Sequence, residues 1–548
     1  MKNWLLLFVL FGCVQCSKTD KSPDPGGNFS ISGVKVNAGS AGGNIFYNIN
    51  YNPVIAISFS APVDHSSVSS NIIIAPSIPF AVSYANNDST IIIQPTAALA
   101  PLSQYHISVL TTLRSQQNIS LSVQGAVNFV TQIDSTDKFP QISDAALLTL
   151  VQKQTFKYFW DFGHPVSGMA RERNSSGDLV ATGGTGFGIM TIPVAISRNF
   201  VTRAEGLARA SLIVNFLKNN CTKYHGAFSH WINGATGATI PFSTNDNGAD
   251  LVETSYLMQG LLVARQYFNS AADPAEIDLR TKINELWDTV EWNWFRKNNE
   301  NVLYWHWSPN LGWAVNAQVR GWNEALITYV MASSSRTDSI TKTVYDNGWA
   351  SNGSIRNNNI YYGYQLPLGP SNGGPMFFEH YSFMGINPTG LMDAYANYQT
   401  QTTNHTKINY EYCRANPRQF FGYSASCWGL TASDIPNNGY HASEPNSDVG
   451  VIAPTAALSS FAYTPVESMQ ALKFFYYKLG DKLWGPYGFY DAFSLKDAWF
   501  ANSTLAIDQG PIIVMIENYR TNLVWDLFTS CPEVKNGLRR LGFTAPYL

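Results

Sequence analysis

The sequence changes its pattern near residue 134, and this change constrains the fold more than any other feature. In the first part of the chain, short β-branched runs alternate with small polar residues, as at Ile55, Ile57 and Phe59. Turn residues separate these runs at intervals typical of a β-sandwich. The polar segment 134–137 then ends the region. We therefore predict an all-β sandwich over residues 30–134.

Helix-start signals dominate the rest of the chain. Thr202-Arg-Ala-Glu205 is a capping box, and Asp273-Pro-Ala-Glu276 and Thr464-Pro-Val-Glu467 combine the same pattern with proline at the first helical position. We recognise about a dozen helical segments, joined by loops rich in Gly, Asn and Trp and without a short repeat. A four-helix bundle would be too small, and a solenoid would show a repeat period. We therefore predict a mainly α fold, an (α/α)6 barrel (toroid) over residues 138–548, in which helix ends and loops meet at one central cleft.

The N-terminus has the features of an export signal. Its apolar run, Trp4 to Gly12, is far shorter than the roughly 20 residues of a membrane-spanning helix. Leu10-Phe11-Gly12-Cys13 resembles a lipobox, in which the cysteine is lipidated, whereas the rival Cys16 follows a glutamine. We expect a lipoprotein signal peptide at 1–12 and a polar tether at 13–29. The mature protein would be exported and anchored to the outer membrane by its lipid alone, in the periplasm or at the cell surface.

The remaining cysteines give little support for a metal site. They are widely spaced and form no CxxC pair: Cys221, Cys413, Cys427 and Cys531. Export permits disulfides, for which Cys413 and Cys427 are the nearest candidates. Free buried thiols explain the same residues equally well.

Composition favours a sugar ligand over nucleic acid. The formal net charge is −3 and no basic stripe is present, which excludes the usual electrostatic pattern of a nucleic-acid-binding protein. Aromatic residues make up 14% of the chain, and many lie in loop-like stretches where their faces can stack on sugar rings. A large core explains some of them. The candidate platforms are Trp231, Trp294, Trp313, Trp322, Trp428 and Trp484.

The strongest chemical signal is a run of acids. Asp246, Asp250 and Glu253 lie at spacings of four and three residues, with no Lys or Arg between them. Helical spacing would place them on one face, although Gly248 moves the expected helix start to Ala249 or Asp250. One of the three acids is explained as a helix cap, but not all three. Crowded carboxylates are typical of acid/base chemistry or cation binding.

A second candidate is Glu324, which starts the uncharged helical segment Ala325-Leu-Ile-Thr-Tyr-Val. Its neighbours Trp322 and Asn323 are a pair of the kind that contacts sugars. A helix-start acid paired with Arg320 is the structural alternative.

Further polar and aromatic residues are candidates for substrate binding. Arg173 can bind hydroxyls or carboxylates, although a surface ion pair explains it as well. Asp508 has the alternative of capping the next helix. The full set of these candidates is Arg173, Trp231, Trp322, Asn323, His380, Tyr381, Trp428, Asp434, Asp508 and Gln509.

Other chemistries have weaker support. Gly183-Gly-Thr-Gly186 lacks the Lys-Ser/Thr of a phosphate loop, and no GxSxG elbow is present. The nine histidines form no HExxH motif, and the acids do not have EF-hand spacing. We therefore expect no metal and no cofactor.

Six motifs occur in one order and together resemble the glucoamylase-like domain of glycoside hydrolase family 144. They cover about residues 140–548 and are Asp250-Leu-Val-Glu253-Thr, Gly260-Leu-Leu, Gly321-Trp-Asn-Glu324, His380-Tyr-Ser-Phe, Cys427-Trp-Gly-Leu-Thr-Ala-Ser-Asp434 and Asp508-Gln-Gly-Pro. In the first region, Phe59-Ser-Ala-Pro-Val-Asp64 and Leu102-Ser-Gln-Tyr105 resemble bacterial Ig-like domains, which are mostly spacers and sometimes bind carbohydrate.

The resemblance implies an (α/α)6 barrel that hydrolyses β-1,2-glucans with inversion at the anomeric carbon. It also implies that Asp246, Asp250, Glu253 and Glu324 lie in the cleft and are needed for activity. Glu379, before His380, departs from the family pattern, where a smaller or amide residue is expected.

An inverting hydrolase needs two carboxyl groups roughly 6.5–9.5 Å apart. Residues three apart on a helix have Cβ atoms only about 5–6 Å apart, so Asp250 and Glu253 alone are too close. We therefore expect one acid of the run to act opposite Glu324, with Glu253 favoured as the general acid because crowding raises a carboxyl pKa.

No long insertion blocks the cleft, so endo cleavage of linear β-1,2-glucan by a monomer is expected, with release of sophorose and short sophorooligosaccharides. The alternatives are an exo-acting, sophorose-releasing hydrolase and a glycan-binding surface lipoprotein without activity. A polysaccharide lyase with a His380–Tyr381 base is a third reading.

Overall fold

The computed structural model describes residues 27–37, 39–40 and 45–548. They divide into two compact units with the boundary between Gln132 and Ile133. The expected signal peptide, Cys13, Cys16 and most of the tether lie outside the described residues. Within the described part of the chain, no helix is long and apolar enough to span a bilayer.

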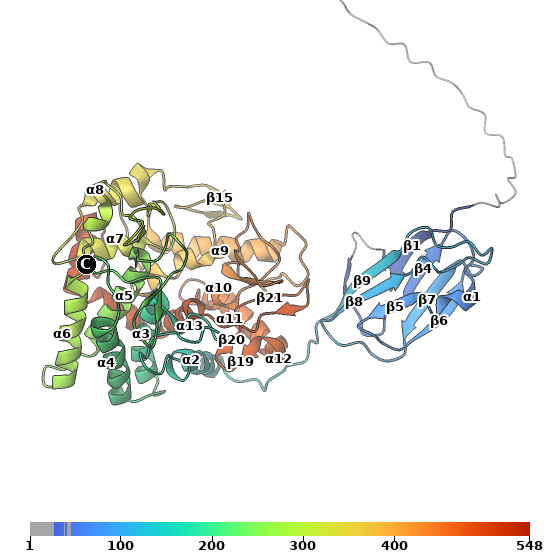
Figure 1. Ribbon diagram of the computed structural model, residues 1–548, viewed down its shortest axis with the longest axis horizontal. Coiled ribbons are helices and arrows are strands. Elements are labelled where there is room, and N and C mark those ends of the chain that lie inside the picture. Colours follow the sequence, from blue (N-terminus) through green and yellow to red (C-terminus); the bar gives the residue numbers. More distant parts are fainter. Residues whose placement is uncertain (1–26, 38, 41–44) are drawn as a thin grey trace, which may run out of the picture. The chain divides into compact units, whose positions relative to one another are not determined.

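The first unit is a β-sandwich, as the alternating pattern predicts. One sheet has the order β2-β1-β4-β7-β6 and the other β3-β9-β8-β5, with only β3 and β9 parallel among the described pairs. Ile57, Ile91 and Ile107 point between the sheets and are wholly buried. The elements, shown in blue in Figure 1, are β1 (Ile31–Val36), β2 (Gly39–Ser40), β3 (Ile45–Ile49), β4 (Ile55–Phe59), α1 (His65–Val68), β5 (Ile72–Ala75), β6 (Phe80–Ala85), β7 (Thr90–Pro95), β8 (Gln104–Val109) and β9 (Gly125–Thr131).

The second unit is largely helical, as predicted. Its α-helices are α2 (Asp144–Trp160), α3 (Thr182–Ser197), α4 (Arg203–Asn219), α5 (Leu251–Tyr267), α6 (Pro274–Asp288), α7 (Leu326–Ser334), α8 (Lys342–Val344), α9 (Tyr398–Ala415), α10 (Pro454–Leu458), α11 (Pro465–Lys473), α12 (Gly480–Leu483), α13 (Ala506–Thr521), α14 (Leu523–Thr529) and α15 (Pro532–Leu541).

Short strand pairs and single 3-10 or π turns join the helices. The strands are β10 (Leu179–Ala181), β11 (Trp231–Asn233), β12 (Thr239–Ile240), β13 (Ala249–Asp250), β14 (His306–Trp307), β15 (Ile360–Tyr361), β16 (Tyr364–Gln365), β17 (Ala432–Ile435), β18 (Gly439–Ala442), β19 (Trp484–Gly485), β20 (Gly488–Phe489), β21 (Phe493–Ser494) and β22 (Trp499–Phe500). The turns are η1 (Trp294–Arg296), η2 (Tyr345–Trp349), η3 (Ser351–Gly353), η4 (Met376–Glu379), η5 (Ser382–Met384) and η6 (Phe474–Lys478).

Helices that are buried over nearly their whole length alternate along the chain with helices that keep an exposed face. The buried ones are α3, α5, α7, α10 and α13, and α3 packs between α5 and α13. Helices α4 and α6 cover the outer side of α3 and α5 (Figure 1). Because α5 is apolar almost all round, it can only be stable inside such a layer.

Local capping signals predict helix starts correctly where no other partner competes for the capping side chain. The capping box at Thr202 and Glu205 is confirmed, with both reciprocal hydrogen bonds present. Asp273 caps α6, but Glu276 pairs with Arg203 and accepts the backbone N–H of Ser270 rather than that of Asp273, so no capping box forms. Thr464 makes no side-chain cap bond.

All four cysteines of the second unit are buried free thiols, so the disulfide alternative is wrong.

Glycines allow α3 and α5 to touch through their backbones. A Cβ at Gly260 would lie 2.1 Å from the carbonyl oxygen of Gly186, and a Cβ at Gly186 would lie 2.2 Å from that of Tyr256. Neither contact is sterically possible, so both positions exclude any side chain. The glycine-rich segment that begins α3 is therefore a helix-packing surface.

We predict that Gly260→Ala destabilises the second unit. The added methyl group meets backbone rather than a flexible side chain, so the helices must separate, at a cost of about 1–3 kcal/mol or more in the free energy of unfolding. Chemical denaturation followed by circular dichroism measures this change. Lys153→Ala on the exposed face of α2 is the matched control and should shift the midpoint very little. Equal midpoints for the two variants would contradict the packing argument.

Candidate active site

Asp250 lies at the centre of the acid run and caps α5. Its Oδ1 accepts the backbone N–H of Glu253 at 2.9 Å, and its side chain is completely buried. The helix thus begins at Leu251, which leaves Asp246 in the preceding loop. The run is therefore partly helical: Glu253 occupies the first turn, Asp250 the cap, and Asp246 approaches from outside the helix.

Two histidines that the sequence did not single out hold the other oxygen of Asp250. His230 Nδ1 and His306 Nε2 lie 3.2 and 3.3 Å from Asp250 Oδ2, and His306 Nε2 is also 3.2 Å from Asp246 Oδ2. Burial raises the pKa of Asp250, but these imidazoles outweigh it and lower that pKa below its usual range. Burial lowers the pKa of His230, yet the charges of Glu253 and Asp250 raise it to about 9.

The same atoms could ligate a cation. Ligand atoms of His230, Asp246 and Asp250 all lie within 4.8 Å of one another. Hydrogen bonds from protonated imidazoles already satisfy these oxygens, so the cluster is explained by charge pairing between its own members.

Glu253 contacts the start of α3. Its Oε2 accepts the backbone N–H of Gly183 at 2.6 Å, and a Cβ on Gly183 would lie 2.6 Å from that same oxygen. This close approach explains the glycine. Burial raises the pKa of Glu253, while the His230 cation and the Gly183 N–H oppose that rise.

Glu324 faces the same space without a cationic partner. Its backbone is fixed by Ser382, which donates to the Glu324 carbonyl, and by Asn323, whose Oδ1 accepts the N–H of Ala325. Burial, with the nearby charges of Glu253 and Asp250, raises the Glu324 pKa to about 7. The alternative, an ion pair with Arg320, does not form among the described residues, since Arg320 bonds Gln318 and Asn347 instead. Glu324 is therefore substantially protonated at neutral pH.

His230, Glu253 and Glu324 line a cavity of about 500 Å³ with aromatic walls, whereas Asp246 and Asp250, expected in the cleft, are not among its lining residues. Trp231 packs on Phe242 with ring centres 4.7 Å apart, and Phe377 stacks on Tyr381 at 5.3 Å. Such walls, combined with a few carboxyl groups, suit a sugar with apolar faces and hydroxyl edges.

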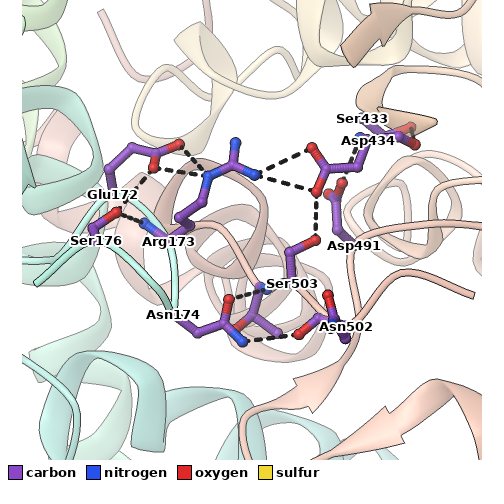
Figure 2. Close-up of polar contacts among 10 residues, drawn as sticks. Glu172, Arg173, Asn174, Ser176, Ser433, Asp434, Asp491, Asn502 and Ser503 are labelled. Atoms are coloured by element: carbon purple, nitrogen blue, oxygen red, sulfur yellow. Dashed lines mark hydrogen bonds and ion pairs between the residues drawn. The ribbon is translucent and has the colours of Figure 1, made fainter. Parts of the chain in front are cut away.

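A second acidic network joins other walls of the cavity (Figure 2). Arg173, which lines the cavity, pairs with Glu172 at 3.0 Å and with Asp434 of β17 at 3.2 Å. Ser503 donates to Asp434, and the Asp434 N–H donates to Asp491 Oδ2 at 2.6 Å. The segment before β10, the β17–β18 hairpin and the segment before α13 are thus tied together.

Asp508 lies behind this network rather than on the cavity surface. It is 3% exposed and hydrogen-bonds to the equally buried Asp491. Burial and the charge of Asp491 raise the Asp508 pKa well above its usual range, and burial raises that of Asp491 to about 7. The two carboxyl groups therefore share a proton.

The structure brings together most of the predicted site residues but not all of them. Arg173, Trp231, Glu253, Glu324 and Tyr381 line the cavity. Trp322, Trp428 and Gln509, predicted as substrate contacts, do not: they are buried in the core, where Trp428 donates to the Glu467 carbonyl and Gln509 to that of Phe489. Trp294 and Trp313 lie together at a separate surface cavity.

His380 is also a correction, because it is 1% exposed and does not line the cavity. Its Nε2 bonds Ser460, and burial lowers its pKa to about 3. A neutral, enclosed imidazole cannot reach a substrate, which removes the predicted contact and the basis for a lyase. Nearby Glu379 is buried and paired with His405 at 2.7 Å, so the departure from the family pattern has a structural partner.

Known proteins resemble both parts of the chain. Residues 316–532 match the family model described as "Putative glucoamylase", and residues 41–131 match that of the bacterial Ig-like domain. An exo β-1,2-glucooligosaccharide sophorohydrolase (non-reducing end) of Parabacteroides distasonis is 45% identical over 432 residues, which are 75% of this chain and 59% of that protein. The chain thus spans 59% of the length of this curated relative.

Solved structures match large parts of the chain as well. The endo-β-1,2-glucanase of Chitinophaga pinensis, with sophorotriose and glucose, is 48% identical with a TM-score of 0.72 and covers 74% of this chain and 100% of its own. A β-1,2-glucanase from Parabacteroides distasonis is 37% identical with a TM-score of 0.71 and covers 93% of this chain and 72% of its own.

We predict that Asp250→Asn lowers the pKa of His230. A carboxylate near an imidazole favours the charged form, so its neutral replacement moves the titration of His230 to lower pH. NMR titration of the imidazole resonances measures the shift. Asp178→Asn, which removes the partner of His164 at 3.2 Å, is the control and should leave the His230 titration unchanged. An unchanged His230 titration in Asp250→Asn would contradict the proposed charge pairing.

Proposed function

This chain belongs to the glucoamylase-like β-1,2-glucanase family, glycoside hydrolase family 144, with an N-terminal bacterial Ig-like domain, and on that premise we propose that it hydrolyses β-1,2-glucosidic bonds in linear β-1,2-glucan and its oligosaccharides. The observation that carries the proposal is that the carboxyl group of Glu324 faces an aromatic cavity beside Glu253 and has no cationic partner among the residues that the structure describes. A protonated acid and a second carboxyl group at one cavity are the requirements of a glycosidase.

We also propose that the helical unit is an (α/α)6 toroid. The alternation of buried and half-exposed helices along the chain supports it, as does the packing of α13 against α3, which brings the last buried helix back to the first. The cavity lies where loops and the first turns of inner helices meet, as this architecture requires.

Within this proposal Glu324 is the general acid and Glu253 the carboxylate that acts opposite it. This differs from the role expected for Glu253 from sequence. Glu324 has no group to stabilise its ionised form except a backbone hydrogen bond, so it keeps its proton to about pH 7. Burial and the charge of Asp250 raise the pKa of Glu253 too, but Glu253 receives the Gly183 N–H and faces the His230 cation, two stabilising contacts for its ionised form that Glu324 does not make. Asp250 has both oxygens engaged and serves to position the others.

We propose exo action with release of a disaccharide, in place of the endo action expected from sequence. The activity named for the Parabacteroides distasonis relative supports this mode. The bridge from Arg173 to Asp434 is consistent with this mode, because it ties together two segments that border the cavity. Endo cleavage is the second candidate, favoured by 48% identity to the Chitinophaga pinensis enzyme over that enzyme's full length. Export, lipidation at Cys13 and a monomeric state remain predictions.

Product analysis distinguishes the two modes. With linear β-1,2-glucan labelled at its reducing end, we expect sophorose from the earliest time points and a labelled polymer that shortens only gradually. A ladder of labelled oligosaccharides would establish endo cleavage instead. If no β-1,2-glucan is cleaved although the protein binds it, the chain is a glycan-binding lipoprotein and the proposed function fails.

We predict that Glu324→Gln lowers kcat on β-1,2-glucan by about 10²–10⁴-fold, because the leaving oxygen is no longer protonated. The loss should be much smaller on an aryl β-sophoroside with a good leaving group, which needs little protonation. Glu253→Gln, in contrast, should lose activity on both substrates. Similar losses on both substrates for Glu324→Gln would contradict its role as the acid. Glu285→Gln, on the exposed face of α6, is the control and should leave the activity unchanged.

The pH profile gives an independent check. Since the Glu324 pKa is raised to about 7 and the acid acts while protonated, kcat on the natural substrate should fall as pH rises through about 7. That alkaline limb should disappear when Glu324→Gln is assayed on the aryl sophoroside. If the fall in kcat above about pH 7 persisted unchanged in Glu324→Gln, a group other than Glu324 would be responsible for it.

A further inference from the structure

A second cavity of about 520 Å³ lies apart from the one that contains Glu253 and Glu324. Two tryptophans, Trp294 and Trp313, line it together with polar side chains that include Glu291, Asn298, Asn299 and Asp338. No residue of this cavity lines the first one. Because aromatic and polar side chains line it, this second cavity is a candidate ligand site.

The aromatic wall is a stack of three rings. His225 covers Trp294 with ring centres 3.4 Å apart and planes at 11°, and Trp313 stacks on Trp294 at 4.9 Å and 29°. Two rings this close to one indole must lie on opposite faces of it. Trp313 thus forms one end of the stack and also packs edge-on against Phe295 and Tyr304, so its position is fixed by its neighbours before any ligand arrives.

The polar wall has a strained backbone. Lys297, Asn298 and Asn299 follow one another with φ of 40°, 58° and 62°, a left-handed run without glycine. Arg296 holds this turn by donating to the carbonyls of Asn299 and Glu300. Such strain persists only where the surroundings impose it, and it is concentrated at functional sites.

The turn presents unused hydrogen-bonding groups. The side-chain amides of Asn298 and Asn299 are exposed, and among the described residues they make no hydrogen bond. Each amide offers donors and an acceptor, as a sugar hydroxyl requires. Lys297 donates to Asn316, Glu291 lies 3.0 Å from His225 Nδ1, and Asp338 accepts the backbone N–H of Asn293 at 2.8 Å. Two carboxylates and one ammonium group thus line the cavity, which leaves it net acidic. That charge disfavours an anionic ligand and favours a neutral one.

The second cavity is connected to the acid cluster through β14. His306 of that strand contacts Asp246 and Asp250, while the next residue, Trp307, packs edge-on against Trp294 at 5.4 Å and 84°. Successive side chains of a strand point to opposite sides, so β14 lies between the acid cluster and the tryptophan stack.

We propose that the Trp294–Trp313 cavity is a second, non-catalytic binding site for a neutral oligosaccharide chain. The identity of the sugar, a β-1,2-linked glucan, rests on the proposed function. Ring C–H groups of the sugar pack on Trp313, and its hydroxyls bond the amides of Asn298 and Asn299. The site retains a long chain on the surface while the first cavity cleaves it.

Affinity electrophoresis tests binding directly. In gels that contain linear β-1,2-glucan, Glu324→Gln should be retarded, and adding Trp313→Ala should weaken the apparent dissociation constant at least about five-fold. Leu311→Ala, on the same loop but outside the cavity, is the matched control and should change the dissociation constant less than about two-fold. Unchanged retention with Trp313→Ala would overturn the proposal.

A second variant separates binding from folding. Asn298→Gly combined with Asn299→Gly removes both amides but suits the left-handed backbone, so the fold is not strained. It should weaken retention as Trp313→Ala does, with an unchanged melting temperature. Full retention in this variant would overturn the assignment of the amides.

Kinetics and other glucans separate this proposal from the proposed function. Trp313→Ala should lower kcat/KM on long glucan by about five-fold and change it by less than about two-fold on a short oligosaccharide that fills only the first cavity. Equal losses on both would mean a structural effect and overturn the second site.

If β-1,2-glucan is not hydrolysed, retention is measured in gels of β-1,3- and β-1,4-glucan. If either gel retains the protein and Trp313→Ala weakens that retention, the result supports the second site. If no gel shows retention that depends on Trp313, the second site is overturned.

Discussion

The candidate site depends on the buried carboxylate of Asp250. A charge enclosed in this way is costly unless each oxygen has a partner. Here one oxygen caps α5 and the other accepts from His230 and His306, so the same group starts a helix and fixes two imidazoles. The segments around residues 230, 250 and 306 are thereby held at one point, and that point is a wall of the cavity.

The arrangement sorts the carboxyl groups by environment. Asp250 has cationic partners and its pKa is lowered, whereas Glu324 is buried near negative charges and its pKa is raised to about 7. Acid/base pairs in hydrolases arise from such differences between otherwise similar groups. Behind the Arg173 bridge, Asp491 and Asp508 form a third kind of group, a buried pair that shares a proton.

Signals carried by neighbouring residues predicted the structure well. The capping box at Thr202 forms, and the acid run ends with Asp250 as a cap and Glu253 in the first turn. The errors concern residues whose exposure depends on distant packing. Trp428 and His380 were both predicted to contact substrate, yet both are enclosed by the core. The two histidines that bind Asp250 stand 20 residues before it and 56 after it, and no local pattern marks them.

The sequence by itself determined the two regions, the periodicity of each, and the acids available for chemistry, because these follow from short-range stereochemistry and residue type. Tertiary structure decided which of those acids is protonated and which aromatic rings face a cavity. Both depend on desolvation and on charges from segments far apart in the chain. Gly186 and Gly260 illustrate the difference: their helices are readable locally, but only the contact between α3 and α5 shows why neither position admits a side chain.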